Sequence, residues 1–548
     1  MTPLSIPLAV LTDSYKVTHP FMYPRAQKMV AYGEMRQAYD KDPNDNRIVF
    51  YGIRYLIENY IAKKWTLQDV AQAEVFFSTH NAGFTGFPFP KDLFLKIVNE
   101  HDGYFPVKIE ALPEGTACHA HVPAFQITAE GEMSRLVTYL ETLLTMIWYP
   151  ITVATLSRRS RDLIQAAYDK SVEQDQYWSL ESRLHDFGFR ACTSIEHSVI
   201  GGTAHLASSF LPLAQRAGLS SLNFTGSDTM SAAFYAQFQL NGGDPVANSI
   251  PASEHSVMTA FRTEKEAMEA MISAFGEGVF ACVMDSYDYQ HALDTVLPSV
   301  ASFKLEKGGF LVLRPDSGDI VESVLLGLRA AENVFGCDVN KKGYKVIRGC
   351  GVIQGDGVSY QSLAKILEAV LAEGYAAQNC AFGMGGGLLQ KLNRDTMSFA
   401  TKLCHIVYED GTKRDVMKHP KTDADKISLP GILDVVRNEQ GIPMVYPRAE
   451  SGIPHKDNIL QVVYNHGKVP LSATATTSSM FTPATSASES VGSAALTLSS
   501  PDSLHAWPKF SDIKARVQKE WEGLPKTFDP ISSALREKIK VVLSAVEA

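Results

Sequence analysis

The chain contains 548 residues, of which 45% are apolar and 20% are charged. These proportions are ordinary for folded globular proteins and exclude a mainly disordered chain. The formal net charge of -9 excludes a sequence-wide basic surface, so nucleic acid is not an expected partner. This length predicts two or three domains, or one large barrel with additions.

The amino-terminal residues give no sign of membrane targeting. The stretch MTPLSIPLAVLTDSYK lacks a basic start, and its apolar part is short and interrupted. We find no apolar span of 18 residues in the sequence. We therefore expect no membrane partner and a cytoplasmic location.

The seven cysteines are scattered and form no CxxC pair. An odd number without regular spacing favours reduced thiols over a disulfide framework. Cys118, His119 and His121 are the tightest metal-like group, but no second ligand pair follows at zinc-finger spacing. A structural role is favoured for these three residues, and no direct metal ligands are predicted.

Residues from about 270 to 400 alternate between short apolar runs, polar or glycine turns, and helical periodicity, which predicts βα units. The clearest helix follows Ser359, and Gly374 is placed to end it. In parallel α/β folds, ligands bind at the carboxyl ends of the strands. The predicted strands are 279–284, 310–313, 352–354 and 381–382.

Three other segments differ from this pattern. Residues 471–505 are rich in Ser, Thr and Ala and have no steady period, which predicts a flexible insertion. Residues 208–222 are typical of a second surface insertion. Residues 507–521 regain helical spacing and predict a terminal helix that docks on the fold.

Charged residues and glycines follow the predicted strands directly. In RPDSG, Arg314 offers a planar fork for phosphate, and Asp316 can accept ribose hydroxyls or hold Mg²⁺ through water. A turn that caps the helix near Ile320 explains this motif equally well. In GDG, Asp356 follows Gly355 and could bind a sugar diol, although Asp-Gly is also a common turn.

The stretch GMGGGLLQK is more specific, because consecutive glycines before a helical run can turn several amides toward one phosphate. Its glycines are Gly385, Gly386 and Gly387. It is neither a P-loop nor a good dinucleotide-binding fingerprint. Together with the preceding motifs, it predicts a site for phosphorylated ribose.

Upstream motifs add residues suited to an aromatic base and to phosphoryl transfer. HDFGFR sets Phe187 three positions before Arg190, although a core Phe and a surface Arg would be commoner. Asp228 could accept a hydrogen bond from an amide substrate or cap a helix. His255 follows Glu254, and imidazole can receive a phosphoryl group on nitrogen.

Taken together, these segments resemble the nicotinate/nicotinamide phosphoribosyltransferase family of type II phosphoribosyltransferases, and within it the nicotinamide enzymes. The resemblance covers most of the first 430 residues, and its specificity comes from the ordered agreement of many motifs. The motifs are DSYKVTHP (13–20), YPITVAT (149–155), HDFGFR (185–190), GSDT (226–229), IPASEHS (250–256), MDSYD (284–288), RPDSG (314–318), VIQGDG (352–357) and FGMGGGLLQKLNRD (382–395).

The resemblance implies an α/β, TIM-barrel-like phosphoribosyltransferase domain together with an α+β domain built from both ends of the chain. The implied boundaries are 1–150 for the amino-terminal α+β domain and 151–440 for the barrel. Residues 441–548 are then a carboxyl-terminal segment that packs on the amino-terminal domain and carries the 471–505 insertion.

The resemblance also implies roles for individual residues. Phe187 and Tyr15 would stack on the two faces of nicotinamide, with Tyr15 supplied by a second subunit of a homodimer. Asp228 would bind the amide nitrogen and disfavour nicotinate, whose carboxylate would face a like charge. His255 would be phosphorylated by ATP, with Glu254 and Asp285 as orienting carboxylates.

The remaining implied contacts concern the phosphoribosyl and pyrophosphate groups. Arginines supply phosphate contacts, Arg314 also borders the base, and further basic residues lie near the site. Acidic and glycine positions surround the ribose and its 5′-phosphate. These positions are Arg190, Arg314, Asp316, Gly355, Asp356, Gly385, Gly386, Arg394, Lys402 and Lys418.

The implied reaction joins nicotinamide to 5-phosphoribosyl 1-pyrophosphate and gives nicotinamide mononucleotide and pyrophosphate. Mg²⁺ is the expected cofactor through the substrate pyrophosphate, and ATP is the expected co-substrate. Ala281 departs from the animal enzymes, which have a serine there, and both insertions lengthen the chain. Two alternatives stay open: a nicotinate phosphoribosyltransferase and a phosphate-binding barrel protein without transferase activity.

Overall fold

The computed structural model describes residues 6–208, 226–420, 426–471 and 506–547. The chain divides into two compact units, one formed by residues 1–152 and 393–548 and the other by residues 153–392. Almost all of the insertions expected at 208–222 and 471–505 lies outside the described residues. Within the described part, no helix combines the length and the apolar character that crossing a membrane requires.

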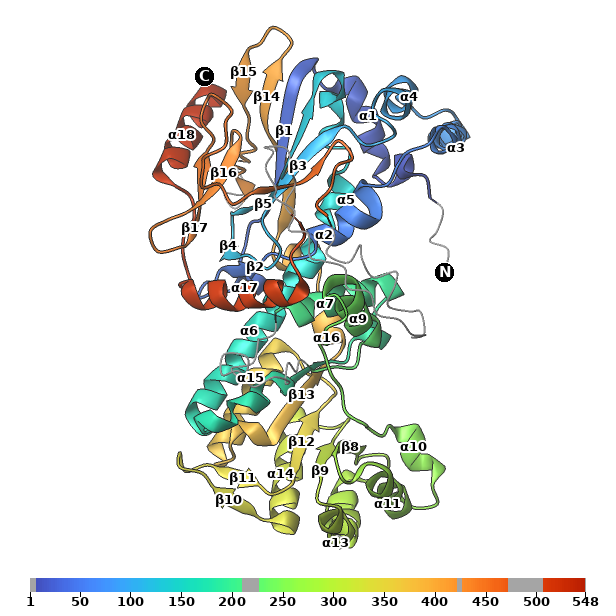
Figure 1. Cartoon of the computed structure of the whole chain (residues 1–548), viewed down its shortest axis with the longest axis vertical. Coiled ribbons are helices and arrows are strands. Elements are labelled where there is room, and N and C mark those ends of the chain that lie inside the picture. Colours follow the sequence, from blue (N-terminus) through green and yellow to red (C-terminus); the bar gives the residue numbers. More distant parts are fainter. Residues whose placement is uncertain (1–5, 209–225, 421–425, 472–505, 548) are drawn as a thin grey trace, which may run out of the picture. The chain divides into compact units, whose positions relative to one another are not determined.

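The unit formed by both ends of the chain is built on an antiparallel sheet of six strands in the order β15-β14-β1-β5-β3-β18 (Figure 1). Strand β1 lies at its centre and is almost entirely buried. The strands are β1 (Ala26–Met35), β3 (Val107–Ala111), β5 (Pro123–Glu130), β14 (Phe399–Tyr408), β15 (Lys413–Asp415) and β18 (Gln461–Asn465). This mixed unit agrees with the expected α+β region.

Smaller elements complete this unit. Two antiparallel strand pairs are separate from the six-stranded sheet, and several helices pack around both. The expected terminal helix is present as α17, with Phe510 and Trp521 buried. The elements are β2 (Arg47–Val49), β4 (Ala117–His119), β16 (Leu433–Arg437), β17 (Pro443–Pro447), α1 (Ser14–Met22), α3 (Leu67–Phe77), α4 (Lys91–Glu100), α5 (Glu141–Thr145), α17 (Phe510–Gly523) and α18 (Ser533–Glu547).

The second unit is built on a parallel sheet of six strands in the order β7-β6-β13-β12-β9-β8. All four strands predicted from the sequence are present in it. The sheet consists of β6 (Leu184–Asp186), β7 (Gly226–Ser227), β8 (Val279–Val283), β9 (Phe310–Arg314), β12 (Cys350–Gln354) and β13 (Cys380–Met384).

The ends of this sheet are connected by an extended segment, residues 248–252. Its Asn248 forms a parallel bridge to Gly226 of β7, and its Ala252 forms one to Ala281 of β8. The sheet therefore curls into a barrel, which confirms the expected barrel-like α/β fold.

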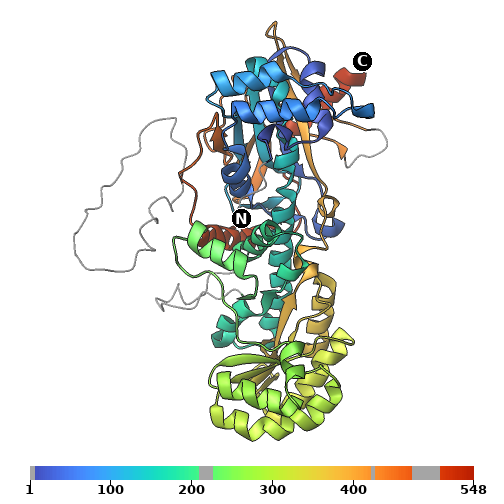
Figure 2. The same cartoon turned by 90° about the vertical axis from the view of Figure 1, so that its right-hand side faces the viewer.

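Helices cover the outside of these strands, as Figure 2 shows for the green and yellow part of the chain. Helix α14 packs on β12, and α11 packs on β8. The helices are α7 (Ile195–Ala207), α9 (Met230–Tyr235), α10 (His255–Ala260), α11 (Glu264–Phe275), α13 (Leu297–Lys307), α14 (Ile320–Phe335), α15 (Tyr360–Ala372) and α16 (Gly386–Leu389). The long helix α6 (Trp148–Ser171) begins in one unit and ends in the other.

Two helix starts show how the sequence fixes the loops of the barrel. Helix α15 begins after Ser359, which forms a capping box with Ser362, and Gly374 follows the helix with a positive φ of 80°. Helix α14 begins at Ile320 as predicted, but its cap is Asp319, whose side chain accepts the N–H groups of residues 321 and 322. The Asp316 carboxylate is therefore not the helix cap.

The barrel unit ends at Leu392, whereas the domain boundary expected from the sequence was 440. The reason lies in strand β14, which begins at Phe399 and pairs along its length with β1. Residues after 392 therefore belong to the unit that contains the antiparallel sheet, although only the short helix α16 separates them from the last barrel strand.

Candidate active site

The parallel strands of the barrel end at one edge, and a cavity of about 610 Å³ lies there. Seven of the residues predicted from the sequence line it, and all of them belong to the barrel unit. The lining residues are Phe187, Phe189, Arg190, Cys192, Asp228, Thr229, Glu254, His255, Ser256, Val283, Arg314 and Asp316. Its size suits a drug-sized or nucleotide-sized ligand.

Arg314, Asp316 and His255 form a connected polar group on the cavity wall. Arg314 Nη2 donates to Asp316 Oδ1 at 2.9 Å, and His255 Nε2 lies 3.5 Å from Asp316 Oδ2. The other ring nitrogen of His255 lies 3.1 Å from the hydroxyl of Ser286. The His255 side chain is 47% exposed, so a reagent in solution can reach it.

Asp285 contacts the loop that carries Asp316, and it is not among the residues that line the cavity. Its Oδ2 accepts the N–H of Asp316 at 2.9 Å and the hydroxyl of Ser317 at 2.5 Å. The carboxylate thereby fixes the loop after β9. Asp285 makes no hydrogen bond to His255 in the described structure, and it reaches the histidine through Asp316 and through its chain neighbour Ser286.

Glu254 lines the cavity next to His255, and its carboxylate contacts the side chain of Ser256. It occupies the position before the first residue of α10, and its carboxylate accepts the hydroxyl of Ser256. The neighbours that contact the imidazole are Asp316 and Ser286. The orienting role that the resemblance implies for Glu254 stays a prediction.

Phe187 lies against the bare backbone of two neighbouring strand ends. A Cβ atom placed on Gly383 would come within 2.0 Å of the Phe187 ring, and one on Gly355 within 3.4 Å of it. The guanidinium carbon of Arg314 lies 5.8 Å from the ring centre. Sequence reasoning missed Gly383, although a glycine inside a predicted strand signals the close approach of another group.

Small apolar side chains inside the barrel also pack against Phe187. Ala281, Val312, Ile353 and Ala381 form one buried cluster, and Phe187 is among the partly buried residues that contact it. Ala281 is 2% exposed. The position where the animal enzymes are expected to have a serine therefore faces the barrel interior behind the aromatic ring.

Asp228 follows β7 and lines the cavity together with Phe187. It does not cap a helix, because Thr229 precedes α9 and no side-chain cap bond forms there. The hydroxyl of Ser249 donates to Asp228 Oδ1. Ser249 was missed by the sequence reasoning, since it lies in the bridging segment 248–252, whose irregular backbone has no recognisable pattern.

The glycine run and the GDG turn occupy loops beside the cavity and are not among its lining residues. Gly385 precedes the short helix α16, and a Cβ atom on it would lie 3.3 Å from the Phe187 carbonyl oxygen. Gly386 begins that helix. Asp356 is exposed, and its carbonyl oxygen accepts the side-chain N–H of Gln354 at 2.8 Å.

Four predicted site residues belong to the other unit, so their part in the site stays a prediction. Tyr15 lies on α1 and is 55% exposed. Arg394 pairs with its neighbour Asp395 at 3.3 Å. Lys402 lies on β14, and Lys418 follows β15.

Lys402 lies in a concentration of positive charge within that unit. Burial lowers its pKa, and the nearby cations Arg36, Lys418 and Lys16 lower it further against the effect of Glu141. Such a group of cations favours an anionic ligand. Sequence reasoning identified Lys402 and Lys418 and missed Arg36 and Lys16, which occur far earlier in the chain.

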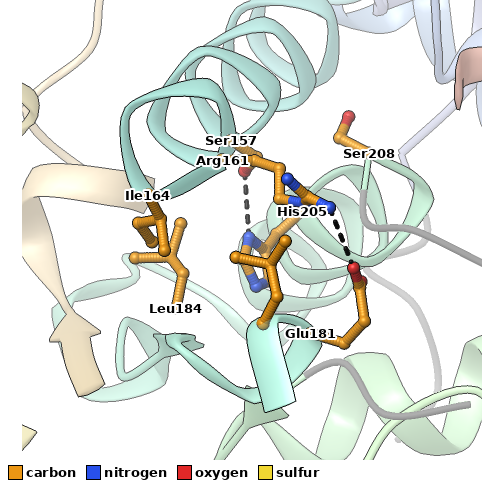
Figure 3. Close-up of a pocket in the computed structure, with 8 residues that line it drawn as sticks. Ser157, Arg161, Ile164, Glu181, Leu184, His205 and Ser208 are labelled. Atoms are coloured by element: carbon orange, nitrogen blue, oxygen red, sulfur yellow. Dashed lines mark hydrogen bonds and ion pairs between the residues drawn. The ribbon is translucent and has the colours of Figure 1, made fainter. Parts of the chain in front are cut away.

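A smaller hollow lies elsewhere in the barrel unit, between α6 and α7 (Figure 3). In it, Ser157 bonds His205 at 2.9 Å, and Arg161 pairs with the buried Glu181 at 3.1 Å. Its volume of about 20 Å³ is enough for about one water molecule. The hollow is therefore too small for a sugar phosphate or a base.

Comparison with known proteins agrees with this arrangement. The model of the nicotinate phosphoribosyltransferase (NAPRTase) family matches residues 182–459. The model of the nicotinamide phosphoribosyltransferase amino-terminal domain matches residues 7–109. The first match covers all the cavity-lining residues, and the second covers Tyr15, Lys16 and Arg36.

Curated relatives show similarity over most of the chain. A nicotinamide phosphoribosyltransferase of Xanthomonas campestris pv. campestris is 37% identical over 79% of this chain and 88% of its own length. A protein of the same name from Mycoplasma pneumoniae is 32% identical over 62% of this chain and 73% of its own length. Another from Acinetobacter baylyi is 27% identical over 84% of this chain and 94% of its own length.

Two solved structures share the fold at low sequence identity. Human nicotinic acid phosphoribosyltransferase matches 97% of this chain and 100% of its own with a TM-score of 0.57 and 16% identity. The nicotinate-nucleotide pyrophosphorylase of Pyrococcus furiosus matches 95% of this chain and 99% of its own with a TM-score of 0.55 and 15% identity. The chain belongs to the nicotinate phosphoribosyltransferase family and is a phosphoribosyltransferase related in sequence to the nicotinamide phosphoribosyltransferases.

Proposed function

We propose that the protein is a nicotinamide phosphoribosyltransferase of NAD salvage, which forms nicotinamide mononucleotide and pyrophosphate from nicotinamide and 5-phosphoribosyl 1-pyrophosphate. One observation carries this proposal: Phe187, Asp228, Arg190 and Arg314 line a single cavity. An aromatic face, a carboxylate acceptor and two guanidinium groups match a planar amide, its N–H groups and phosphates.

The base pocket accounts for a preference for nicotinamide. The pyridine ring would lie on Phe187, and its carboxamide N–H would donate to Asp228. Nicotinate carries a carboxylate at that position, which would meet the Asp228 carboxylate and be repelled. Ser249 already donates to Asp228 Oδ1, so the bound amide would use the remaining acceptor capacity of this side chain.

The strand-end charges account for the transfer step. As the bond from C1′ of the ribose to the pyrophosphate breaks, the sugar develops positive charge, and the ring nitrogen of nicotinamide forms the new bond to C1′. Asp316 would stabilise the charge on the sugar, and Arg190 and Arg314 would bind the negative phosphates. The ring nitrogen needs orientation and no deprotonation.

We further propose that Mg²⁺ enters with the substrate. The described residues contain no group of three or more His, Cys, Asp or Glu side chains able to hold a metal ion. Asp316 could contact the ion through water, with most ligands coming from pyrophosphate and solvent. When bound, the ion would reduce the negative charge of the leaving pyrophosphate.

ATP would act as a co-substrate through His255. A neutral ring nitrogen of His255 would attack the γ-phosphorus, and ADP would leave with the electrons of the broken P–O bond. The exposed imidazole at the cavity wall supports this role, and its 3.5 Å contact with Asp316 connects it to the transfer site. The phosphorylated ring would add negative charge there and change the binding of substrate and Mg²⁺.

The protein would act in the cytoplasm as a homodimer with shared sites. Tyr15 is 55% exposed on α1, and Phe21 and Met22 on the same helix are 59% and 69% exposed. Large exposed apolar side chains on one helix favour burial against another subunit. A partner's Tyr15 would then cover the face of the pyridine ring opposite Phe187.

The glycine at position 383 should be essential for base binding. Gly383→Ala places a methyl group within 2.0 Å of the Phe187 ring, so the ring must move out of the stacking position. We expect the nicotinamide KM to rise by about tenfold or more, since small misplacements in an active site are costly. Gly278→Ala is the matched control, because its nearest atom lies at 3.8 Å. Equal kinetics for the two variants would contradict the prediction.

Asp228→Ala should reduce kcat/KM for nicotinamide by about 10- to 100-fold, because a buried substrate amide loses its charged acceptor. The same change should affect nicotinate much less, so the preference for nicotinamide narrows. Steady-state kinetics with both bases measures this effect, and Asp244→Ala serves as a control in the same unit. Unchanged kinetics with both bases would remove Asp228 from the proposed role, and a wild-type preference for nicotinate would favour the nicotinate enzyme.

His255→Ala should abolish the stimulation by ATP and leave slow basal synthesis in place. Wild-type protein incubated with γ-labelled ATP should gain an acid-labile, base-stable label that the variant lacks. His291→Ala, a change of an exposed histidine in the same unit, should behave like wild type. Equal ATP stimulation in wild type and His255→Ala would refute phosphorylation at this position.

Shared sites predict complementation between inactive variants. Homodimers of Tyr15→Ala and of Phe187→Ala should each have two damaged sites, whereas a mixed dimer should contain one intact site. We expect mixed dimers to recover about half of the wild-type activity per dimer, by the counting of sites in a symmetric pair. Mixed dimers confirmed by differential tagging that stay as inactive as the parents would exclude sharing of Tyr15.

A further inference from the structure

Asp186 is a fully buried carboxylate that none of the roles above uses. It is the last residue of β6, it is 0% exposed, and it directly precedes Phe187 in the chain. A carboxylate in such a place costs free energy unless its surroundings satisfy it. Its contacts therefore indicate what it does for the neighbouring cavity.

Asp186 joins the two loops that carry the base-binding residues. Its Oδ1 accepts the N–H of Gly188 at 2.7 Å, inside the loop that presents Phe187 and Arg190. Its main-chain carbonyl oxygen accepts the N–H of Asp228 at 2.9 Å. One residue thus holds the aromatic side and the carboxylate side of the pocket.

The space around the carboxylate is closely fitted. A Cβ atom on Gly188 would lie 3.0 Å from Oδ1, and one on Gly202 of α7 would lie 3.1 Å from Oδ2 and 3.3 Å from Thr229 Cγ2. Among the described residues, Oδ2 makes no hydrogen bond of normal geometry, although the Thr229 side chain is close enough to lower the pKa of Asp186. The carboxylate therefore holds the Gly188 loop through Oδ1, while Oδ2 lies buried close to Thr229.

We propose that Asp186 is a positioning residue for base recognition, which acts through Oδ1 on Gly188 to keep Phe187 and Arg190 in register with Asp228. This inference rests on the proposed function. The residue touches no substrate itself, and its effect passes through the two loops.

The pH dependence of folding stability gives a second measurement on Asp186, because it reports the cost of burying its charge. Burial raises the pKa of Asp186 to about 6, and the neighbouring Asp228 raises it as well, against the effects of the Gly188 N–H and the Thr229 side chain. Because the folded-state pKa lies above the ordinary value of 3.8 for an aspartate, protonation of Asp186 stabilises the fold. This contribution is complete below the unfolded-state pKa and is lost as pH rises through about 6. At pH 8 the ionised carboxylate therefore reduces stability.

The test compares Asp186→Ala with Asp186→Asn. The Asn side chain keeps an oxygen acceptor for Gly188 and removes the charge, whereas Ala removes the acceptor. We expect Asp186→Ala to raise the nicotinamide KM by about tenfold or more, as expected for a misplaced binding group, and Asp186→Asn to stay within about threefold of wild type. Asp186→Asn should also unfold at a temperature equal to or above that of wild type at pH 8, with the advantage shrinking below pH 6.

Hydrogen exchange supplies a readout that needs no turnover. The Gly188 amide should exchange faster in Asp186→Ala and stay protected in Asp186→Asn. Glu181→Ala is the matched control, because it removes a buried carboxylate of the same unit from its ion pair with Arg161 (Figure 3). It should lower stability while leaving the Gly188 exchange rate and the nicotinamide KM unchanged.

Two results would overturn the inference: unchanged Gly188 exchange in Asp186→Ala, or an unchanged KM for the base in that variant. A wild-type protein that uses only nicotinate would refute the proposed substrate, and the Asp186 comparison would then be made with nicotinate. If the wild-type protein is inactive with both bases, the Gly188 exchange rates in Asp186→Ala and Asp186→Asn alone decide whether Asp186 holds the loop. Failure of the proposed substrate and failure of the positioning role of Asp186 therefore give different results.

Discussion

The close contact of the Phe187 ring with strand backbone is the constraint on which the cavity depends. The ring occupies the volume that a side chain at position 383 would need, and it also borders Gly355. Any larger residue at Gly383 would displace the ring from this position. The ring in turn lies beneath the guanidinium group of Arg314, so one packing contact places both the aromatic and the cationic parts of the site.

Near this contact, two buried or partly buried carboxylates hold the loops of the site in place by accepting hydrogen bonds from backbone N–H groups. Asp285 fixes the loop that carries Asp316, and Asp186 fixes the loop that carries Phe187. Neither carboxylate lines the cavity. Such supporting groups hold the charged side chains that do line it, which favours electrostatic stabilisation because little reorganisation is then needed during reaction.

Sequence reasoning recovered the local structure of the barrel well. Apolar runs followed by polar turns gave β8, β9, β12 and β13, and helical spacing after Ser359 gave α15, because these signals depend on residues close together in the chain. The very short strand β7 and the bridging segment 248–252 left no such signal. As a result, Ser249 and the closure of the barrel came only from the structure.

The sequence alone determined the family, the strand-end location of the charged residues and the identity of most cavity-lining groups, since ordered motifs and local periodicity are written in neighbouring residues. Only the tertiary structure decided which partners these groups have. Asp319 caps α14 in place of Asp316, Glu254 bonds Ser256, and Asp186 and Gly383 control the setting of Phe187. The first three contacts join residues at most three positions apart and depend on the exact backbone path of each loop, which residue types alone do not specify. The contact of Gly383 with Phe187 joins β13 to the loop after β6, so it depends on how the sheet is assembled.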